Sequence, residues 1–373
     1  MRFIIYSHSS EYYGAPHSIK ELSDELVKNN HEVYYILPST GSFYDVLNES
    51  EYNISIIPNP LWVKPNCFSS YGGWFKIKEE VKERIILSGN FFYNFFKHKK
   101  FVESINPDYI IVNTATAPTG VFVAKIMKIK SVLWIREVIG GEYDYSHKLF
   151  FSGNMFKMML RFSDYKICPS LFLKNTFKQL YNIQDIHVIP NSIPSRINNI
   201  PENHTGRSKI GLVGLVSKRK GQVEFLKRIF EEKHAYEVHV FGHISENDLS
   251  DIKQYTGQGL FVHGFKKDID CIYTKFDIYI NLGVNEGFGR TTIEAMSFGK
   301  LVLGRDSGAT SEIIHHGNNG FLFNDIDDLL FLLERMGDDY DLNVIRENAI
   351  ETSKKYSVGR VFQEFINLIG RKF

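Results

Sequence analysis

Residues 277–296 read DIYINLGVNEGFGRTTIEAM and decide the fold. The first six letters form an apolar run that is typical of a buried strand, and a helical pattern begins near Arg290. A Gly-Phe-Gly turn lies between the strand and the helix. This combination predicts an anion-binding site in an α/β sheet, because free backbone N–H groups and the positive end of the helix point to one place.

Two carboxylates flank this turn with seven residues between them. Glu286 precedes the turn and Glu294 lies in the helix that follows it. A carboxylate on each side of an anion site suits a ligand with a central diphosphate and hydroxyl groups at both ends, which is the shape of a nucleotide-sugar. An ordinary helix with a charged first turn is the alternative, since Glu is favourable there in any case.

The string from Glu286 to Met296 resembles the E-x7-E signature of retaining GT-B glycosyltransferases of family 4. The resemblance implies that Glu294 holds the ribose hydroxyls of the nucleotide and that Glu286 lies near the donor sugar. It also implies an amide cradle for the sugar and diphosphate, and nearby hydroxyl donors. These are Gly287, Phe288 and Gly289 for the cradle, and Thr291 and Thr292 for the hydroxyls.

A basic loop that opens with Gly214 resembles the Lys-Gly motif of the same family. Lys220 matches the lysine that neutralises the donor diphosphate, where a cation is most useful as negative charge builds up on the leaving group. Many members carry Arg directly after the glycine, where this chain has Leu215. Arg219 or Lys218 would then supply the second cation. The alternative is a solvated basic loop that caps the next helix.

Buried-strand patterns alternate with helical patterns along both halves of the chain, which is typical of doubly wound parallel sheets. We expect one Rossmann-like domain over residues 1–195 and a second over residues 205–355. The family resemblance implies that the two face a central cleft, and that a last helix at 356–373 completes the first domain. The expected strands are 3–6, 32–37, 54–57, 109–112, 131–135, 165–168, 187–189, 209–213, 237–241, 260–262, 278–280 and 301–303.

The first half resembles the family less closely, and acceptors bind there in that family. Gly14 matches a glycine loop near the reaction centre, and His17 flanks it. Arg136 or Glu137 stands where many members have a His at a strand end. Asn113 follows another strand. We interpret these five residues as acceptor-side candidates.

Composition and charge exclude several classes of protein. The chain has 373 residues, 43% of them apolar and 23% charged, which fits a globular protein of two domains. A net charge of +1 gives no reason to expect a nucleic-acid partner. Three scattered cysteines and the lack of a signal peptide or a long apolar run lead us to expect a cytoplasmic protein.

An Asp-x-Asp pair at Asp268 and Asp270 matches the metal motif of the other major glycosyltransferase fold. We discount it, because it begins a helix, where acidic residues are electrostatically ordinary. We therefore expect neither a metal nor a cofactor.

Two basic, aromatic segments lie at 91–100 and 148–161. Such segments can lie in a membrane interface, or they can be buried helix faces with solvated lysines. We favour core packing and keep peripheral membrane contact as the alternative.

Taken together, the sequence predicts a retaining, metal-independent GT-B glycosyltransferase. It would move a hexosyl group from a nucleotide-sugar to a glycan or a lipid-linked acceptor in bacterial surface polysaccharide synthesis. Two rivals stay open. One is a GT-B epimerase or hydrolase of the nucleotide-sugar, and the other is a non-catalytic subunit that binds a partner glycosyltransferase.

Overall fold

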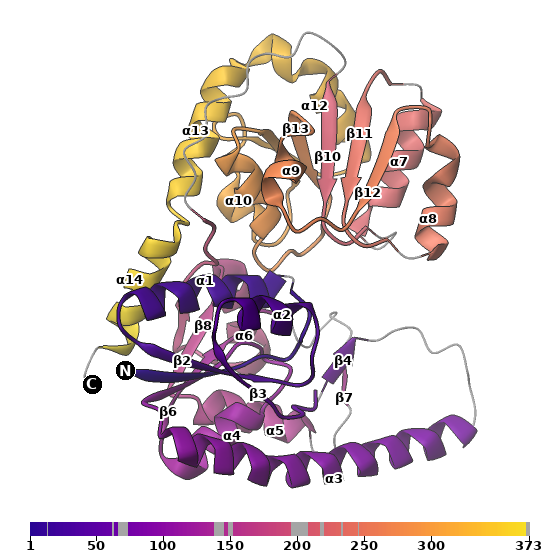
Figure 1. The fold of residues 1–373 in the computed structure, drawn as a ribbon. Coiled ribbons are helices and arrows are strands. Elements are labelled where there is room, and N and C mark those ends of the chain that lie inside the picture. The colour runs from indigo at the N-terminus through magenta and orange to yellow at the C-terminus, as the bar shows by residue number, and fades with distance from the viewer. Residues whose placement is uncertain are drawn as a thin grey trace. The chain divides into compact units, whose positions relative to one another are not determined.

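The computed structural model divides into two compact units. It describes residues 1–12, 14–61, 63–65, 74–137, 145–147, 152–194, 208–216, 220–232, 234–244 and 246–370. Unit 1 comprises Met1–Ser192 and Val361–Phe373, and unit 2 comprises Ile193–Arg360. Each unit has its own parallel sheet (Figure 1). Two short strands, β4 (Val63–Pro65) and β7 (Tyr145–His147), pair antiparallel.

Unit 1 is built on a seven-stranded sheet with the order β3-β2-β1-β5-β6-β8-β9. The order reverses between β1 and β5, so these two strands flank the switch point of the sheet. The strands are β1 (Arg2–Tyr6), β2 (Glu32–Leu37), β3 (Asn53–Ile56), β5 (Tyr109–Val112), β6 (Lys130–Trp134), β8 (Tyr165–Cys168) and β9 (Ile186–Val188). The helices are α1 (Gly14–Lys28), α2 (Ser42–Glu49), α3 (Trp74–Ile105), α4 (Thr119–Met127), α5 (Ser152–Phe162), α6 (Leu171–Tyr181) and α14 (Val358–Ile369).

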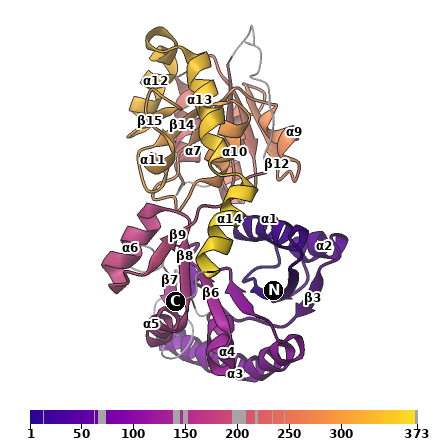
Figure 2. The same ribbon diagram turned by 90° about the vertical axis from the view of Figure 1, so that its left-hand side faces the viewer.

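Helices cover both faces of this sheet, so its strands are apolar on both sides. Ile4 of β1 packs with α3, α4, α5 and α6, whereas Phe3 packs with α1, α2 and α14 on the other face. Figure 2 shows α14 beside β6 and β8. The Phe365 ring of α14 stacks on Trp134 at 5.9 Å, and both side chains are buried. Burial of a side chain of this size stabilises a fold by roughly 1.5–3 kcal/mol.

Unit 2 is built on a six-stranded sheet with the order β12-β11-β10-β13-β14-β15. Its order reverses between β10 and β13. The strands are β10 (Lys209–Val213), β11 (Glu237–Phe241), β12 (Leu260–Gly264), β13 (Ile278–Asn281), β14 (Leu301–Arg305) and β15 (Phe321–Phe323). The helices are α7 (Gln222–Glu231), α8 (Glu246–Ile252), a 3-10 turn (Lys253–Tyr255), α9 (Ile269–Tyr273), α10 (Arg290–Ser297), α11 (Thr310–Ile313), α12 (Ile326–Asp339) and α13 (Leu342–Lys354).

The two doubly wound sheets confirm the predicted fold class. Three strands, β4, β7 and β15, were not predicted, and strands of three residues are too short for a period to identify them reliably. No helix within the described ranges combines the length and the apolar character that a membrane span requires.

The preference for core packing in the segment 91–100 was only half right. Phe91 and His98 are buried on the inner face of α3, but Phe92, Tyr93 and Phe96 are exposed on the other side. The segment 148–161 lies partly outside the described residues. Within its described part, Phe156, Met159 and Leu160 are buried, as core packing requires.

Candidate functional site

Two loops of unit 2 meet at the point where its strand order reverses. One follows β10 and carries Lys220, and the other follows β13 and carries Glu286. The Lys220 Nζ lies 3.0 Å from the Glu286 Oε1, and both side chains keep between a quarter and a third of their surface exposed. Ligands of open α/β sheets bind at such switch points. The structure thus joins two residues that the sequence placed in separate motifs.

Close backbone packing holds Glu286 in this position. Its carboxylate lies against Gly283, where any Cβ would overlap the Oε1 atom. Gly308 has a φ of +64°, and a Cβ there would lie 2.7 Å from both the backbone N and O of Glu286. The Ala309 N–H also donates to the Glu286 carbonyl at 2.8 Å. The loop after β13 therefore rests directly on the turn after β14.

The glycine turn ends at Gly289, which caps α10 in the left-handed region with a φ of +86°. Asn281, at the end of β13, ties the strand to the helix, because its Nδ2 donates to the Thr292 Oγ1 at 3.1 Å. The Thr291 hydroxyl lies 2.6 Å from the Tyr279 hydroxyl. Both predicted hydroxyl donors thus hold the start of α10 in place.

Phe288, predicted as part of the amide cradle, has a buried side chain. Its ring meets the edge of Tyr356 at 5.8 Å. Gly287 lies beside it in the same turn. The Phe288 side chain therefore anchors the turn in the core of unit 2, and only the backbone of 287–289 is placed to cradle an anion.

Glu294 is buried and lies in a network of hydrogen bonds. The Arg290 Nε donates to its Oε1 at 2.7 Å, and the Tyr273 hydroxyl donates to its Oε2 at 2.9 Å. Burial, together with the nearby Glu294 carboxylate, raises the pKa of Tyr273, so this hydroxyl stays protonated and donates. Neither partner was among the predicted site residues. The spacing of four residues from Arg290 to Glu294 on one helix could have revealed the first.

The loop after β10 is shaped by glycines. Gly214 has a φ of +122° and Gly221, which caps α7, has a φ of +79°. A Cβ on Gly242 would overlap the Gly214 carbonyl, so the loops after β10 and β11 touch through their backbones. The Leu215 side chain is half exposed. Arg219 and Lys218 lie outside the described residues.

In unit 1, Asn113 and Arg136 come together at the carboxyl edge of the sheet. Asn113 follows β5, and its Nδ2 donates to the Ala15 carbonyl of α1 at 3.0 Å. The Arg136 Nε donates to the Asn113 Oδ1 at 2.9 Å, and its Nη1 donates to Asn191. The guanidinium also lies 4.4 Å from the Trp134 ring centre. Arg136 therefore bridges segments that lie far apart in the sequence.

Glu137, the next residue, is held by the loop after β5. Its Oε1 accepts from the Thr114 hydroxyl at 2.8 Å and its Oε2 from the Ala115 N–H at 3.1 Å. Burial lowers the pKa of the neighbouring His8, against the opposing effect of Glu137 and with a further contribution from Arg136. Glu137 is thus engaged in the network of unit 1.

The other two acceptor-side candidates lie on α1. Gly14 is its first residue, with a φ of +42°. The His17 Nδ1 lies 3.4 Å from the Glu21 Oε1, and the buried Ser192 hydroxyl donates to the other oxygen of Glu21 at 2.7 Å. His17 is therefore joined to the Glu21–Ser192 pair, a link that the sequence analysis did not foresee.

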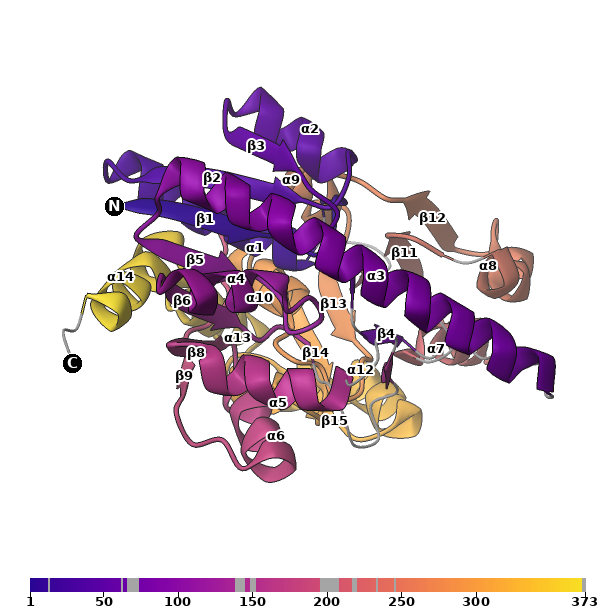
Figure 3. The same ribbon diagram turned by 90° about the horizontal axis from the view of Figure 1, so that it is seen from below.

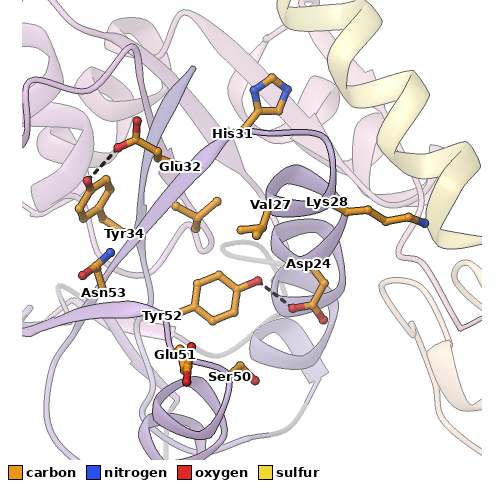
Figure 4. A pocket seen from close by; sticks show the side chains of 11 residues that line it. Asp24, Val27, Lys28, His31, Glu32, Tyr34, Ser50, Glu51, Tyr52 and Asn53 are labelled. Atoms are coloured by element: carbon orange, nitrogen blue, oxygen red, sulfur yellow. Dashed lines mark hydrogen bonds between the residues drawn. The ribbon is translucent and has the colours of Figure 1, made fainter.

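Two other features are a helix cap in unit 2 and a cavity at the amino edge of the unit 1 sheet. Asp268 accepts from the Asp270 N–H at 2.9 Å and so caps α9. An open cavity of about 500 Å³ lies where β2 and β3 begin, at the amino edge of the unit 1 sheet (Figure 4). There the Tyr52 hydroxyl donates to Asp24 at 2.7 Å. The cavity is at the opposite edge from the one where ligands of such sheets bind.

Family models match most of the chain. The model described as Glycosyltransferase Family 4 matches residues 12–196, and the model described as Glycosyl transferases group 1 matches residues 207–339. The chain belongs to the group 1, family 4 glycosyltransferases. No curated protein sequence matches this glycosyltransferase.

Solved structures resemble the glycosyltransferase over its whole length. HepE of Anabaena, crystallised with UDP and glucose, has a TM-score of 0.77 at 18% identity, with 99% of each chain covered. A glycosyltransferase of Rickettsia africae has a TM-score of 0.74 at 18% identity, with 98% of this chain and 97% of that chain covered. Sucrose-phosphate synthase of Thermosynechococcus elongatus has a TM-score of 0.72 at 13% identity, with 99% and 98% covered. The fold is GT-B.

Proposed function

We propose that this glycosyltransferase moves a hexosyl group from a nucleoside diphosphate sugar to a glycan or lipid-linked acceptor, with retention of configuration and without a metal. We place the reaction in the cytoplasm, in the synthesis of a bacterial surface polysaccharide. The observation that carries the proposal is the Lys220–Glu286 pair at the switch point of unit 2, 3.0 Å apart.

The donor's diphosphate would lie between Lys220 and the start of α10. The lysine ammonium and the amides of 287–289 supply positive charge there, and this stabilisation grows as the diphosphate leaves. Glu286 would accept hydrogen bonds from the sugar hydroxyls and orient the ring. HepE has been crystallised with UDP-glucose, which favours UDP as the leaving group.

Glu294 would hold the ribose. Each of its oxygens accepts one hydrogen bond in the structure, from Arg290 and from Tyr273. A carboxylate has about four acceptor positions, so lone pairs remain for the two ribose hydroxyls. Arg290 and Tyr273 would fix the carboxylate before the nucleotide arrives.

The transfer itself would need no strong protein base. The bond between the anomeric carbon and the diphosphate oxygen breaks, and the acceptor oxygen attacks from the same face. The departing phosphate oxygen takes the acceptor proton, so charge and atoms balance. Arg136 and Asn113 would shape the acceptor side through their network with Ala15 and Asn191.

The rival activities receive less support. An epimerase or hydrolase needs acid and base groups, and Glu137 accepts hydrogen bonds at both oxygens from its own unit. The complete pair of Glu286 and Glu294 argues against a non-catalytic subunit, whose donor site would be free to lose either residue.

A thermal-shift screen of the purified protein against UDP, GDP, ADP, CMP and dTDP, with and without EDTA, tests the donor site. A ligand that binds only the native state raises the melting temperature with the logarithm of its concentration. We expect UDP to raise it equally with and without EDTA. A shift that requires a divalent ion would contradict the metal-free site, and no shift with any nucleotide would favour the non-catalytic subunit.

Retention needs its own measurement. We expect the glycosyl product to keep the anomeric configuration of the donor, as read from the proton coupling of the anomeric carbon by NMR. An inverted product would overturn the proposed same-face attack.

A further inference from the structure

The long helix α3 has apolar side chains on two opposite faces. Its inner face is buried in unit 1 through Phe91, His98 and Val102. Among the α3 side chains that the structure describes, the outer face exposes five large apolar ones, which are Ile85 (59% exposed), Ile86 (52%), Phe92 (65%), Tyr93 (65%) and Phe96 (71%). The inner face alone anchors the helix, so packing within the described part of unit 1 does not account for the outer face.

The five exposed side chains form one stripe. Ile85, Phe92 and Phe96 are spaced by seven and four residues, and Ile86 and Tyr93 by seven, so all point to the same side of the helix. Figure 3 shows α3 on one side of unit 1, together with α4 and α5. These neighbours add Ile126 (59% exposed) and Met158 (41%). Contiguous exposed apolar surface of this kind marks an interaction site.

The charges around the stripe are mainly basic. The segments 88–100, 119–128 and 152–162 contain no Asp or Glu, in a chain whose net charge is only +1. The acidic residues of α3 lie outside these segments, with Glu79, Glu80 and Glu83 before the stripe and Glu103 after it, where Glu103 lies 3.2 Å from Lys99. The basic residues of the three segments are Lys97, Lys99, Lys100, Lys125, Lys128, Lys157 and Arg161.

We propose that this outer face of α3, with the basic residues of α4 and α5, docks on an anionic lipid bilayer. Aromatic and aliphatic side chains would enter the headgroup region, where Phe and Tyr are favoured. The lysines would lie against anionic headgroups. The Lys97 Nζ already lies 4.6 Å from the Tyr93 ring centre, so charge and ring reach the same surface.

A second copy of the chain fits this face poorly. A symmetric dimer would place the same patch on itself, and its lysines would then oppose one another. The inference rests on α3 and its neighbours, and it stands or falls separately from the proposed reaction.

Co-sedimentation of the full-length protein with vesicles tests the proposal. We expect binding to vesicles of phosphatidylcholine with phosphatidylglycerol, little binding to phosphatidylcholine alone, and a decline as salt increases. The double substitution Phe92→Ser/Phe96→Ser should weaken binding by about tenfold or more. Lys97→Glu/Lys100→Glu should weaken it similarly and remove most of the salt dependence.

Phe331→Ser is the matched control, because Phe331 is 60% exposed on α12 of unit 2. It should bind vesicles as the wild type does. All variants should keep their nucleotide-induced thermal shift, which separates lost docking from a failed donor site. Equal binding to neutral and anionic vesicles, or no binding at all, would overturn the proposal. So would a dimer in solution that Phe92→Ser/Phe96→Ser dissociates, because a second copy would then cover the stripe.

Discussion

The two sheets reverse their strand order in the same way, yet their carboxyl edges are built differently. In unit 2 the charged pair Lys220–Glu286 lies on loops, partly exposed and held by backbone turns. In unit 1 the Arg136 guanidinium and the Glu137 carboxylate form hydrogen bonds with side chains and backbone amides of neighbouring loops. We infer from this difference that the unit 2 edge recognises the charge of its ligand, whereas the unit 1 edge recognises the shape of its ligand.

The largest effect should follow from Glu286→Gln. Gln has the same shape but cannot carry the charge that pairs with Lys220, so we expect the turnover rate to fall on the order of 10²–10³-fold. The melting temperature should change little, because exposed ion pairs contribute only about 0–1 kcal/mol. Initial rates at saturating donor measure the loss.

Glu246→Gln makes the same change at an exposed position of α8 and should leave the rate unaltered. If Glu286→Gln also turned over at the wild-type rate, the unit 2 edge would not be the site of chemistry.

A backbone change should have the next largest effect. Gly308→Ala adds a Cβ within 2.7 Å of the Glu286 backbone at a φ of +64°. The loop must move, so we expect about a tenfold or greater fall in rate and a loss of roughly 1–3 kcal/mol in the free energy of unfolding. Gly257→Ala is the control, because its φ is +90° but nothing lies within 4 Å of the new Cβ. A fall in stability without a fall in rate at Gly308 would show that Glu286 tolerates the movement.

The difference between local patterns and distant contacts explains what the sequence could predict. The apolar runs of β2, β5 and β10 are continuous, so their bounds follow from local pattern. Lys220 and Glu286 lie in short motifs and could be found in the same way. The bridge from Arg136 to Asn191 spans 55 residues, and no local pattern reveals such a contact. The pattern at 91–100 was visible as basic and aromatic, but it did not tell which side of α3 is buried, because apolar residues occur around the whole helix.

Arg136→Lys tests the shape hypothesis for unit 1. Lysine keeps the charge but lacks the planar fork that reaches both Asn113 and Asn191. We expect unit 1 to lose about 1–3 kcal/mol of stability, and acceptor use to weaken, while the UDP-induced thermal shift of unit 2 stays the same. Arg161→Lys, at an exposed position of α5, is the control. A lost response to UDP would mean that the two edges are not independent.

The smallest effect should appear as pH dependence. Burial lowers the pKa of His98 to about 4, although its Nε2 lies 3.2 Å from the Pro58 carbonyl and donates to it. The unfolded state therefore takes up the proton first as the pH falls. The contribution of the neutral His98 to the free energy of unfolding is complete above a pH of about 6.5. It declines as the pH falls toward about 4, with a loss of roughly 2 kcal/mol near pH 5.

His98→Gln keeps a hydrogen-bond donor and removes the titration, so its stability should depend less on pH when denaturant unfolding is compared at neutral and acid pH. His315→Gln, at an exposed position, should follow the wild type. Unit 2 has its own acid-sensitive pair, His239 and His263. The Nδ1 of His239 lies 3.0 Å from the Nε2 of His263, and burial lowers the pKa values of both. An unchanged pH dependence in His98→Gln would therefore show that His98 is not the source of the acid sensitivity, and would leave His8 of unit 1 and this pair in unit 2 as the buried histidines to test next.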